Sequence, residues 1–262
     1  MIPDQTTSLT ALITGASSGI GRAIARKLAK DGYRLLLLAR REEKLSILQT
    51  ELQNLCEVDI LVVDINDHEH LHRELQRHLQ QTPIDILINN AGLALGLEPA
   101  DQTDWQDWRN MIETNCLSLA YITRQILPSM IEHNRGHIIN MGSIAGSYAY
   151  KGANVYGASK AFVEQFSANL RSDLLGSAIR VTNIEPGLLG DSEFSQVRFK
   201  GDRQRAKSVY ENLQPLKSED IAESVAWVLQ QPAHVNINRI EIMPVHQALG
   251  GPVVTRNGHQ QN

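Results

Sequence analysis

The sequence predicts a single α/β domain in which helices cover both faces of a parallel sheet, a doubly wound arrangement. Seven short apolar segments alternate along the chain with longer amphipathic segments of helical periodicity. These short segments read as continuous apolar runs, which is typical of strands that are buried on both faces. Because strand and helix alternate, we expect right-handed crossovers between neighbouring parallel strands.

The expected elements follow from this pattern in chain order. Strands are expected at residues 9–14, 33–39, 59–63, 84–89, 137–141, 179–184 and 237–243. Helices are expected at residues 19–30, 42–54, 68–80, 105–131 and 154–175. No linker divides the chain, so residues 1–262 form one expected domain. Within it we expect a substrate loop at about 187–216, where polar residues dominate, and a polar tail at about 250–262 that is either disordered or docked on a neighbouring subunit.

Composition limits the classes of partner. With 262 residues, 42% of them hydrophobic, the chain is long enough to bury a substantial core. The net charge of −4 and the mixing of acidic and basic residues argue against nucleic acid. The apolar runs are too short to span a bilayer, and the N-terminus does not read as a signal peptide, so we expect no membrane partner and a cytoplasmic location. Cys56 and Cys116 have no metal-ligand spacing, and we expect reduced cysteines and no metal site.

A glycine-rich turn links the first expected strand to the first expected helix. Residues 14–21 read Thr-Gly-Ala-Ser-Ser-Gly-Ile-Gly. Glycines let the backbone approach a pyrophosphate, and the helix N-terminus offers unpaired N–H groups, so this position predicts a dinucleotide site. Such a turn can also serve only tight packing of strand and helix. The residues assigned to the site are Gly15, Ser17, Ser18, Gly19, Ile20 and Gly21.

The end of the second expected strand bears on the choice of cofactor. Proteins that bind NAD tend to place a carboxylate there, which accepts hydrogen bonds from the ribose 2′-hydroxyl. This chain has Arg40 and Arg41 instead. Because guanidinium groups attract a 2′-phosphate, we favour NADP over NAD. The alternative is a pair of solvated arginines that open the next helix.

Ser143, Tyr156 and Lys160 have the spacing of a proton-transfer site. Tyr156 follows Ser143 by thirteen residues, and Lys160 is four residues further on. A free tyrosine titrates near ~10, but a cation one helical turn away favours its phenolate. Tyr156 is therefore a candidate acid or base, and Ser143 a candidate hydrogen-bond partner for a substrate oxygen. A tyrosine and a lysine at this spacing can also simply decorate a solvated face.

Several motifs together resemble the short-chain dehydrogenase/reductase family, and nearly all of the chain fits. They are residues 14–21, 89–92 and 186–187, with Asn115, Ser143, Tyr156 and Lys160 between them in order. The resemblance implies a Rossmann-type sheet, an oxidoreductase, and a homodimer or homotetramer. It also implies that Asn115 lies at a break in its helix and completes the catalytic set by holding a water that links the lysine to solvent. The cofactor contacts that it implies are Asp64, Ile65, Asn90, Tyr156, Lys160, Pro186, Gly187, Leu188 and Leu189.

Four further segments resemble a narrower group, the NADP-dependent 3-hydroxy acid dehydrogenases, also called L-allo-threonine or serine dehydrogenases. These segments are residues 90–99, 184–190, 193–202 and 232–238. The resemblance implies oxidation of short 3-hydroxy acids or amino acids, such as L-allo-threonine, serine or 3-hydroxypropionate, or reduction of malonic semialdehyde. A small anionic substrate needs a cation, and Arg198, ahead of Lys200, is our candidate in the expected substrate loop. The alternative for these two residues is a solvated basic loop.

Two other functions remain open at this level. A general carbonyl or sugar reductase shares the fold and the acid–base set, because a fold does not determine one substrate. A cofactor-sensing protein without catalysis is the second alternative. It is disfavoured because the chain keeps both Tyr156 and Lys160.

Overall fold

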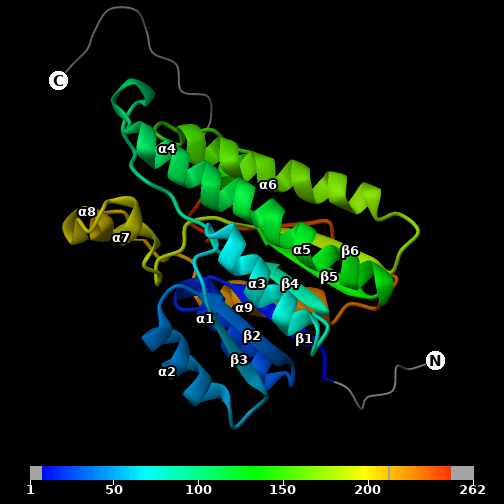
Figure 1. Cartoon of the computed structure of the whole chain (residues 1–262). Coiled ribbons are helices and arrows are strands. Elements are labelled where there is room, and N and C mark those ends of the chain that lie inside the picture. Colours follow the sequence, from blue (N-terminus) through cyan, green and yellow to red (C-terminus); the bar gives the residue numbers. More distant parts are fainter. Residues whose placement is uncertain (1–7, 212, 249–262) are drawn as a thin grey trace, which may run out of the picture.

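The computed structural model describes residues 8–211 and 213–248, and a seven-stranded parallel sheet lies at its centre (Figure 1). The strands are β1 (Thr10–Thr14), β2 (Arg34–Ala39), β3 (Val58–Val62), β4 (Ile86–Asn89), β5 (Gly136–Met141), β6 (Ile179–Pro186) and β7 (Arg239–Ile242). Their order is β3-β2-β1-β4-β5-β6-β7. Strands β1 to β3 are added towards one edge of the sheet and β4 to β7 towards the other, so the order of addition reverses between β1 and β4. In such sheets ligands bind beyond the carboxyl ends of the strands at this reversal.

Helices cover both faces of the sheet, which confirms the doubly wound arrangement (Figure 1). One face carries α1 (Gly19–Lys30), α2 (Glu42–Leu52) and α9 (Ser218–Leu229), and the other carries α3 (His68–Leu79), α5 (Leu119–Glu132) and α6 (Asn154–Asp173). Leu35 and Leu37 belong to the first core, whereas Leu36 and Leu38 belong to the second. Successive strand residues point to opposite faces, so a strand covered on both sides is apolar throughout.

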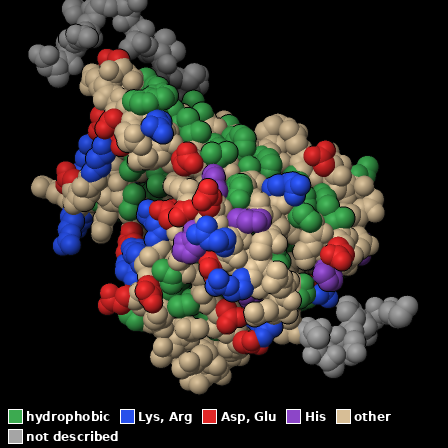
Figure 2. Space-filling model, viewed as in Figure 1, with side chains coloured by type: hydrophobic (Ala, Val, Ile, Leu, Met, Phe, Trp, Pro, Cys, Tyr) green, Lys and Arg blue, Asp and Glu red, His purple; other side chains and the backbone are tan. Residues whose placement is uncertain are grey.

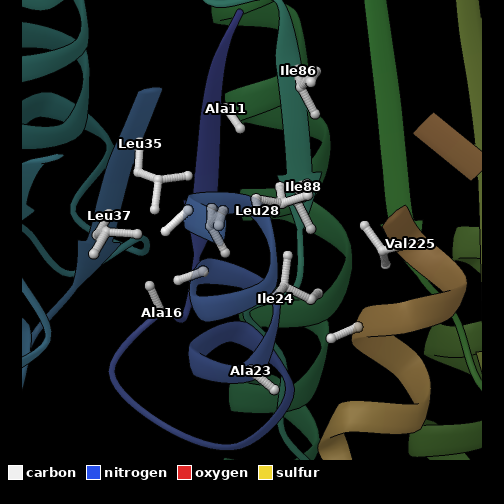
Figure 3. Packing of buried hydrophobic residues seen from close by; sticks show 14 of the residues in the cluster. Ala11, Ala16, Ala23, Ile24, Leu28, Leu35, Leu37, Ile86, Ile88 and Val225 are labelled. Carbon is white, nitrogen blue, oxygen red and sulfur yellow. The ribbon is translucent and has the colours of Figure 1, made fainter. Parts of the chain in front are cut away.

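Helix α1 is held firmly against the sheet. Ile24 and Leu28 are fully buried in one cluster with Leu37 of β2, Ile88 of β4 and Val225 of α9 (Figure 3). Full burial of each such side chain stabilises the fold by roughly 1.5–3 kcal/mol. The first turn of α1 is therefore a rigid part of the carboxyl edge of the sheet.

The helix expected at residues 105–131 is broken in the structure. It consists of α4 (Trp105–Ile112), a π-helical segment Glu113–Ser118 and α5. Helical periodicity alone does not show this interruption, but it agrees with the break at Asn115 that the family resemblance implies. Each π turn holds an extra residue, which rotates the following side chains relative to an α-helix, and such segments occur frequently at functional sites.

The sequence expectation also missed helix α9, because residues 218–229 were not among the expected helices. Five buried residues lie on its inner face at helical spacing: Ile221, Ala222, Val225, Val228 and Leu229. Asp220 accepts a hydrogen bond from the Lys217 amide at 2.8 Å and caps the first turn. The helical spacing of these apolar residues is visible in the sequence and indicates the helix.

The expected substrate loop is partly helical. It contains α7 (Phe194–Arg198) and α8 (Arg203–Ser208), and Leu189 pairs with Leu216 at its base. Two single turns complete the fold, Ala100–Gln102 and Ile144–Gly146. Among the described residues, no helix is long and apolar enough to cross a membrane. The expected tail at 250–262 lies outside the described residues.

Candidate active site

A cavity of about 1060 Å³ lies at the carboxyl edge of the sheet, where the topology places a ligand site. The glycine turn, the ends of five strands and the segment 187–210 line it. Most residues that the sequence singled out meet there: Gly15, Ser17, Ser18, Gly19, Ile20, Arg40, Arg41, Asp64, Ile65, Asn90, Ser143, Tyr156, Lys160, Pro186, Gly187, Leu188, Leu189 and Arg198. Gly21 and Asn115 are not among the residues that line the cavity.

The glycine turn brings α1 directly against the end of β1. Gly15 has φ +67°, a conformation that L side chains rarely adopt. At Gly21 an added Cβ would lie 2.5 Å from the Gly15 carbonyl oxygen, so only glycine fits. Ser18 caps α1 without using its side chain, and the first turn contains no acidic residue. The N–H groups of this turn are therefore suited to binding an anion.

Asn90 braces this turn from the neighbouring strand. Its Nδ2 donates to the Thr14 carbonyl oxygen at 2.9 Å. In return, Thr14 Oγ1 accepts from the backbone N–H groups of Asn90 at 3.0 Å and Ala91 at 2.9 Å. The bonds join β1 to the segment that follows β4, and they hold the two sides of the reversal point together.

The two arginines differ in how the fold holds them. Arg41 Nη2 donates to Ser17 Oγ at 3.0 Å and to Ser18 Oγ at 2.8 Å, which ties the guanidinium to the glycine turn. The side chain of Arg40 is 70% exposed, and its Nη1 lies 3.4 Å from Asp64 Oδ2. Arg41 is thus the cation that the glycine turn holds in place, although the sequence alone places both arginines equally at the end of the second strand.

Ser143, Tyr156 and Lys160 converge beside the end of β5. Ser143 opens the turn Ile144–Gly146, and its Oγ accepts from the Ala145 amide at 3.2 Å. Tyr156 and Lys160 lie one turn apart on α6, and each is 7% exposed. Lys160 Nζ donates to the Met141 carbonyl oxygen at 2.8 Å and lies 6.0 Å from the centre of the Tyr156 ring. The three residues that the sequence spacing picks out therefore form a cluster in the folded protein.

Burial, rather than the charge of Lys160, is the largest influence on the pKa of Tyr156 in this structure. Burial raises the pKa of Tyr156 to about 12, while the hydrogen bond with Ser143 and the charge of Arg198 act in the opposite direction. Burial also lowers the pKa of Lys160 to about 8. Removal from water disfavours a charged phenolate and a charged ammonium alike, and it is the largest cause of both shifts.

Asn115 lies in the π-helical segment and is tied to the strand edge. Its Oδ1 accepts from the Leu93 amide at 2.9 Å, and its Nδ2 donates to the Leu93 carbonyl oxygen at 2.8 Å and to Ser159 Oγ at 3.0 Å. A Cβ on Gly92 would lie 3.2 Å from Asn115 Oδ1 and 3.4 Å from Lys160 Nζ. A side chain at position 92 would therefore press against both the asparagine and the lysine.

The far end of the cavity holds Arg198 close to Tyr156. The Arg198 Cζ atom lies 5.5 Å from the centre of the Tyr156 ring. Its Nε donates to the Gly96 carbonyl oxygen at 3.0 Å and its Nη2 to the Tyr150 hydroxyl at 3.1 Å. Lys200 instead pairs with Asp107 at 2.8 Å and does not line the cavity. Of the two cations in the expected substrate loop, Arg198 thus lines the cavity beside Tyr156, and Lys200 does not.

The comparisons with known proteins agree with this geometry. Residues 9–202 match the model of the family described as short chain dehydrogenase. The chain belongs to that family. The NADP-dependent 3-hydroxy acid dehydrogenase YdfG of Salmonella typhi is 52% identical over 247 residues, which cover 94% of this chain and 99% of that protein. Sulfoacetaldehyde reductase 2 of Chromohalobacter salexigens is 44% identical over 252 residues, covering 94% and 98%.

A solved structure extends the comparison to three dimensions. It is described as the closed form of serine dehydrogenase complexed with NADP+, has 49% sequence identity and a TM-score of 0.89, and covers 95% of this chain and 100% of its own. The family resemblance and the Rossmann-type fold expected from the sequence are thereby confirmed.

Sequence reasoning missed several residues of the site of this short-chain dehydrogenase. Tyr150 and Lys151 line the cavity from one loop, and Phe194 lines it from α7. The Phe194 ring lies 5.8 Å from the Tyr156 ring, at an angle of 58°. No spacing motif in the sequence predicts these residues. The segment with Tyr150 and Lys151 and the segment with Phe194 are far apart in the chain and meet only in the folded molecule.

Proposed function

We propose that this short-chain dehydrogenase transfers a hydride between NADP(H) and the 3-position of short 3-hydroxy acids or 3-hydroxy amino acids. The observation that carries the proposal is the position of Arg198, a cation 5.5 Å from the ring of the candidate acid–base tyrosine and inside the same cavity. A substrate with a carboxylate near its hydroxyl would bridge the two. The names of the relatives, a 3-hydroxy acid dehydrogenase and a serine dehydrogenase, support this substrate class.

The cavity fits NADP. The glycine turn and the first turn of α1 suit the pyrophosphate, and the space beside Asp64 and Ile65 suits the adenine ring. Arg40 and Arg41, with the hydroxyl of Ser18, suit a 2′-phosphate. Residues 186–189 line the opposite end, beside Ser143 and Tyr156, where the nicotinamide would lie. When bound, NADP supplies the hydride acceptor, and in its reduced form the donor.

The protein residues then provide positioning and proton transfer. Tyr156 removes the proton of the 3-hydroxyl during oxidation and returns it to the carbonyl during reduction, while Ser143 holds the same oxygen. Lys160 binds the cofactor ribose, and at neutral pH its charge favours the Tyr156 phenolate. Asn115 carries the proton route onward through a water held next to the lysine.

A substrate panel tests the proposal. NADP reduction is measured with L-allo-threonine, serine, 3-hydroxypropionate and neutral short alcohols, and again with NAD. We expect the acids to be oxidised with a preference for NADP. Arg198→Met should raise KM for the acids roughly 10- to 100-fold, since it removes a charge-assisted hydrogen bond, and should leave the neutral alcohols unaffected. Activity restricted to uncharged alcohols or ketones would instead identify a general carbonyl or sugar reductase.

A second anionic substrate class merits a place in this panel. A relative that is 44% identical is a sulfoacetaldehyde reductase. A sulfonate carries the same single negative charge as a carboxylate, and Arg198 would bind either. Faster NADPH oxidation with sulfoacetaldehyde than with malonic semialdehyde would assign the sulfonate as the preferred anion.

We further propose that the enzyme is a cytoplasmic homodimer or homotetramer. Ile112, Leu117 and Phe162, on α4, the π-helical segment and α6, are 47%, 51% and 40% exposed. Hydrophobic side chains form a band over these helices on the face seen in Figure 2. Exposed apolar patches of this kind mark interaction surfaces. Cys56 and Cys116 are both free, as expected of a reducing compartment.

A further inference from the structure

Residues of the short helix α7 line the cavity, and the helix is held at both ends. Glu193, which precedes it, accepts from Arg41 Nη1 at 2.7 Å and from Lys44 Nζ at 2.6 Å. These partners lie 152 and 149 residues away in the sequence. At the other end of α7, Arg198 lies beside the Tyr156 ring. One helix of five residues thus connects the cations beside the glycine turn to the candidate acid–base residue.

The anchor at Glu193 is stronger than an ordinary surface ion pair. Single exposed pairs contribute little, but here each carboxylate oxygen receives its own charge-assisted bond. Lys44 and Arg41 lower the pKa of Glu193 to about 2, so the carboxylate stays charged at any physiological pH. The preceding residue, Ser192, packs against the glycine turn, since a Cβ on Gly19 would lie 3.1 Å from its Cβ. The backbone, as well as the side chain, therefore holds α7 close.

Arg41 is shared between this anchor and the candidate phosphate site. Its Nη1 binds Glu193, whereas Nε and Nη2 face Ser17 and Ser18. The edge of the Arg41 guanidinium that carries Nε and Nη2 lies at the glycine turn, and together with Arg40 it is suited to a 2′-phosphate. Arg40, Arg41 and Lys44 carry three positive charges against the two negative charges of Glu193 and Asp64, so the group keeps a net positive charge that attracts a phosphate monoester. Carboxylate and phosphate therefore complement one another on these cations.

We propose that Glu193 is a positioning residue that holds α7 closed across the cofactor, so that retention of NADP(H) and placement of Arg198 depend on the same ion pairs. The half concerning Arg198 rests on the proposed function, because it requires an anionic substrate. The half concerning cofactor retention requires no substrate and is measured separately.

Stopped-flow fluorescence of bound NADPH tests the cofactor half. In Glu193→Gln the dissociation rate should rise roughly 3- to 20-fold, as expected for the loss of two charge-assisted bonds at a partly exposed site. Glu211→Gln is the matched control, because Glu211 lies in the same loop and forms no ion pair with any described residue. Release of NADPH at the wild-type rate from Glu193→Gln would overturn the proposal. Slower release would also overturn it, since it would mean that the carboxylate competes with the phosphate.

A double-mutant cycle separates the ion pairs from a general loss of structure. Lys44→Met should also speed NADPH release, and Glu193→Gln combined with Lys44→Met should be less than additive. In steady state, KM for 3-hydroxypropionate should rise in Glu193→Gln, with kcat changed less than KM. Additive effects on release would contradict the shared anchor. If release changes as expected but no hydroxy acid is oxidised by the wild type, the proposed function fails and the cofactor anchor stands.

Discussion

Tyr156 illustrates how far a residue's chemistry depends on its surroundings. Its spacing from Ser143 and Lys160 could be read from the sequence, because α6 places positions 156 and 160 on one face. Its pKa could not be read in this way. The phenol is buried, so its pKa is raised to about 12 although a lysine lies one turn away. Burial is a tertiary property, and no local pattern reports it.

Tyr156→Phe should abolish most turnover and leave cofactor binding intact. Positioned acid–base catalysis contributes roughly 10²–10⁴-fold, so kcat should fall by that factor. NADPH binding, measured by fluorescence, should stay close to the wild-type value. Tyr148→Phe is the control, because Tyr148 lines the same cavity and has no assigned catalytic role. A Tyr156→Phe enzyme with a near-normal kcat would exclude the tyrosine as the acid–base residue.

The direction of the Tyr156 pKa shift also predicts a pH dependence. Oxidation needs the deprotonated phenol, and a raised pKa leaves little of it at neutral pH. The wild-type rate of oxidation should therefore keep rising with pH, with no plateau below about pH 12, whereas reduction, which needs the protonated phenol, should not rise. Equal pH profiles for the two directions would contradict this assignment.

The π-helical segment is an element that local periodicity does not reveal, although the family resemblance implies a break in the helix at Asn115. The residues of Glu113–Ser118 are compatible with an ordinary helix, and the periodicity on both sides continues across them. What stabilises the break lies elsewhere in the chain, since Asn115 binds both backbone groups of Leu93 and the Ser159 hydroxyl. Contacts with residues that are distant in the sequence therefore stabilise the π-helical segment.

Asn115→Ala should therefore lower both stability and activity. The substitution removes three hydrogen bonds and leaves the Leu93 groups unpaired, so the free energy of unfolding should fall by about 2–4 kcal/mol. Denaturant unfolding measures this loss, and kcat is measured beside it. Cys116→Ala, a change in the same turn, should have a smaller effect on both. An Asn115→Ala protein of unchanged stability but reduced kcat would separate the proton route from the structural role.

At the scale of the molecule, the surface of α4, the π-helical segment and α6 contrasts with α3. Over α3, acidic, basic and histidine side chains mix, whereas hydrophobic side chains form the band beside it (Figure 2). Leu117→Glu should break an oligomer formed through this band, because it buries an unpaired charge in the interface. Light scattering after size-exclusion chromatography should report a lower mass than for the wild type. Leu55→Glu, at a residue of similar exposure on the opposite face of the sheet, should leave the mass unchanged.

The sequence by itself determined the doubly wound sheet, the glycine turn and the positions of Ser143, Tyr156 and Lys160. Each of these depends on local periodicity or on residue spacing, and both can be read from the sequence. Only the tertiary structure decided which cations serve the site. Arg198 lies in the cavity and Lys200 is paired with Asp107, although the two are neighbours in one loop. Arg41 meets Glu193 across 152 residues. Such pairings depend on how distant segments are brought together by burial of the core, and no pattern within either segment specifies them.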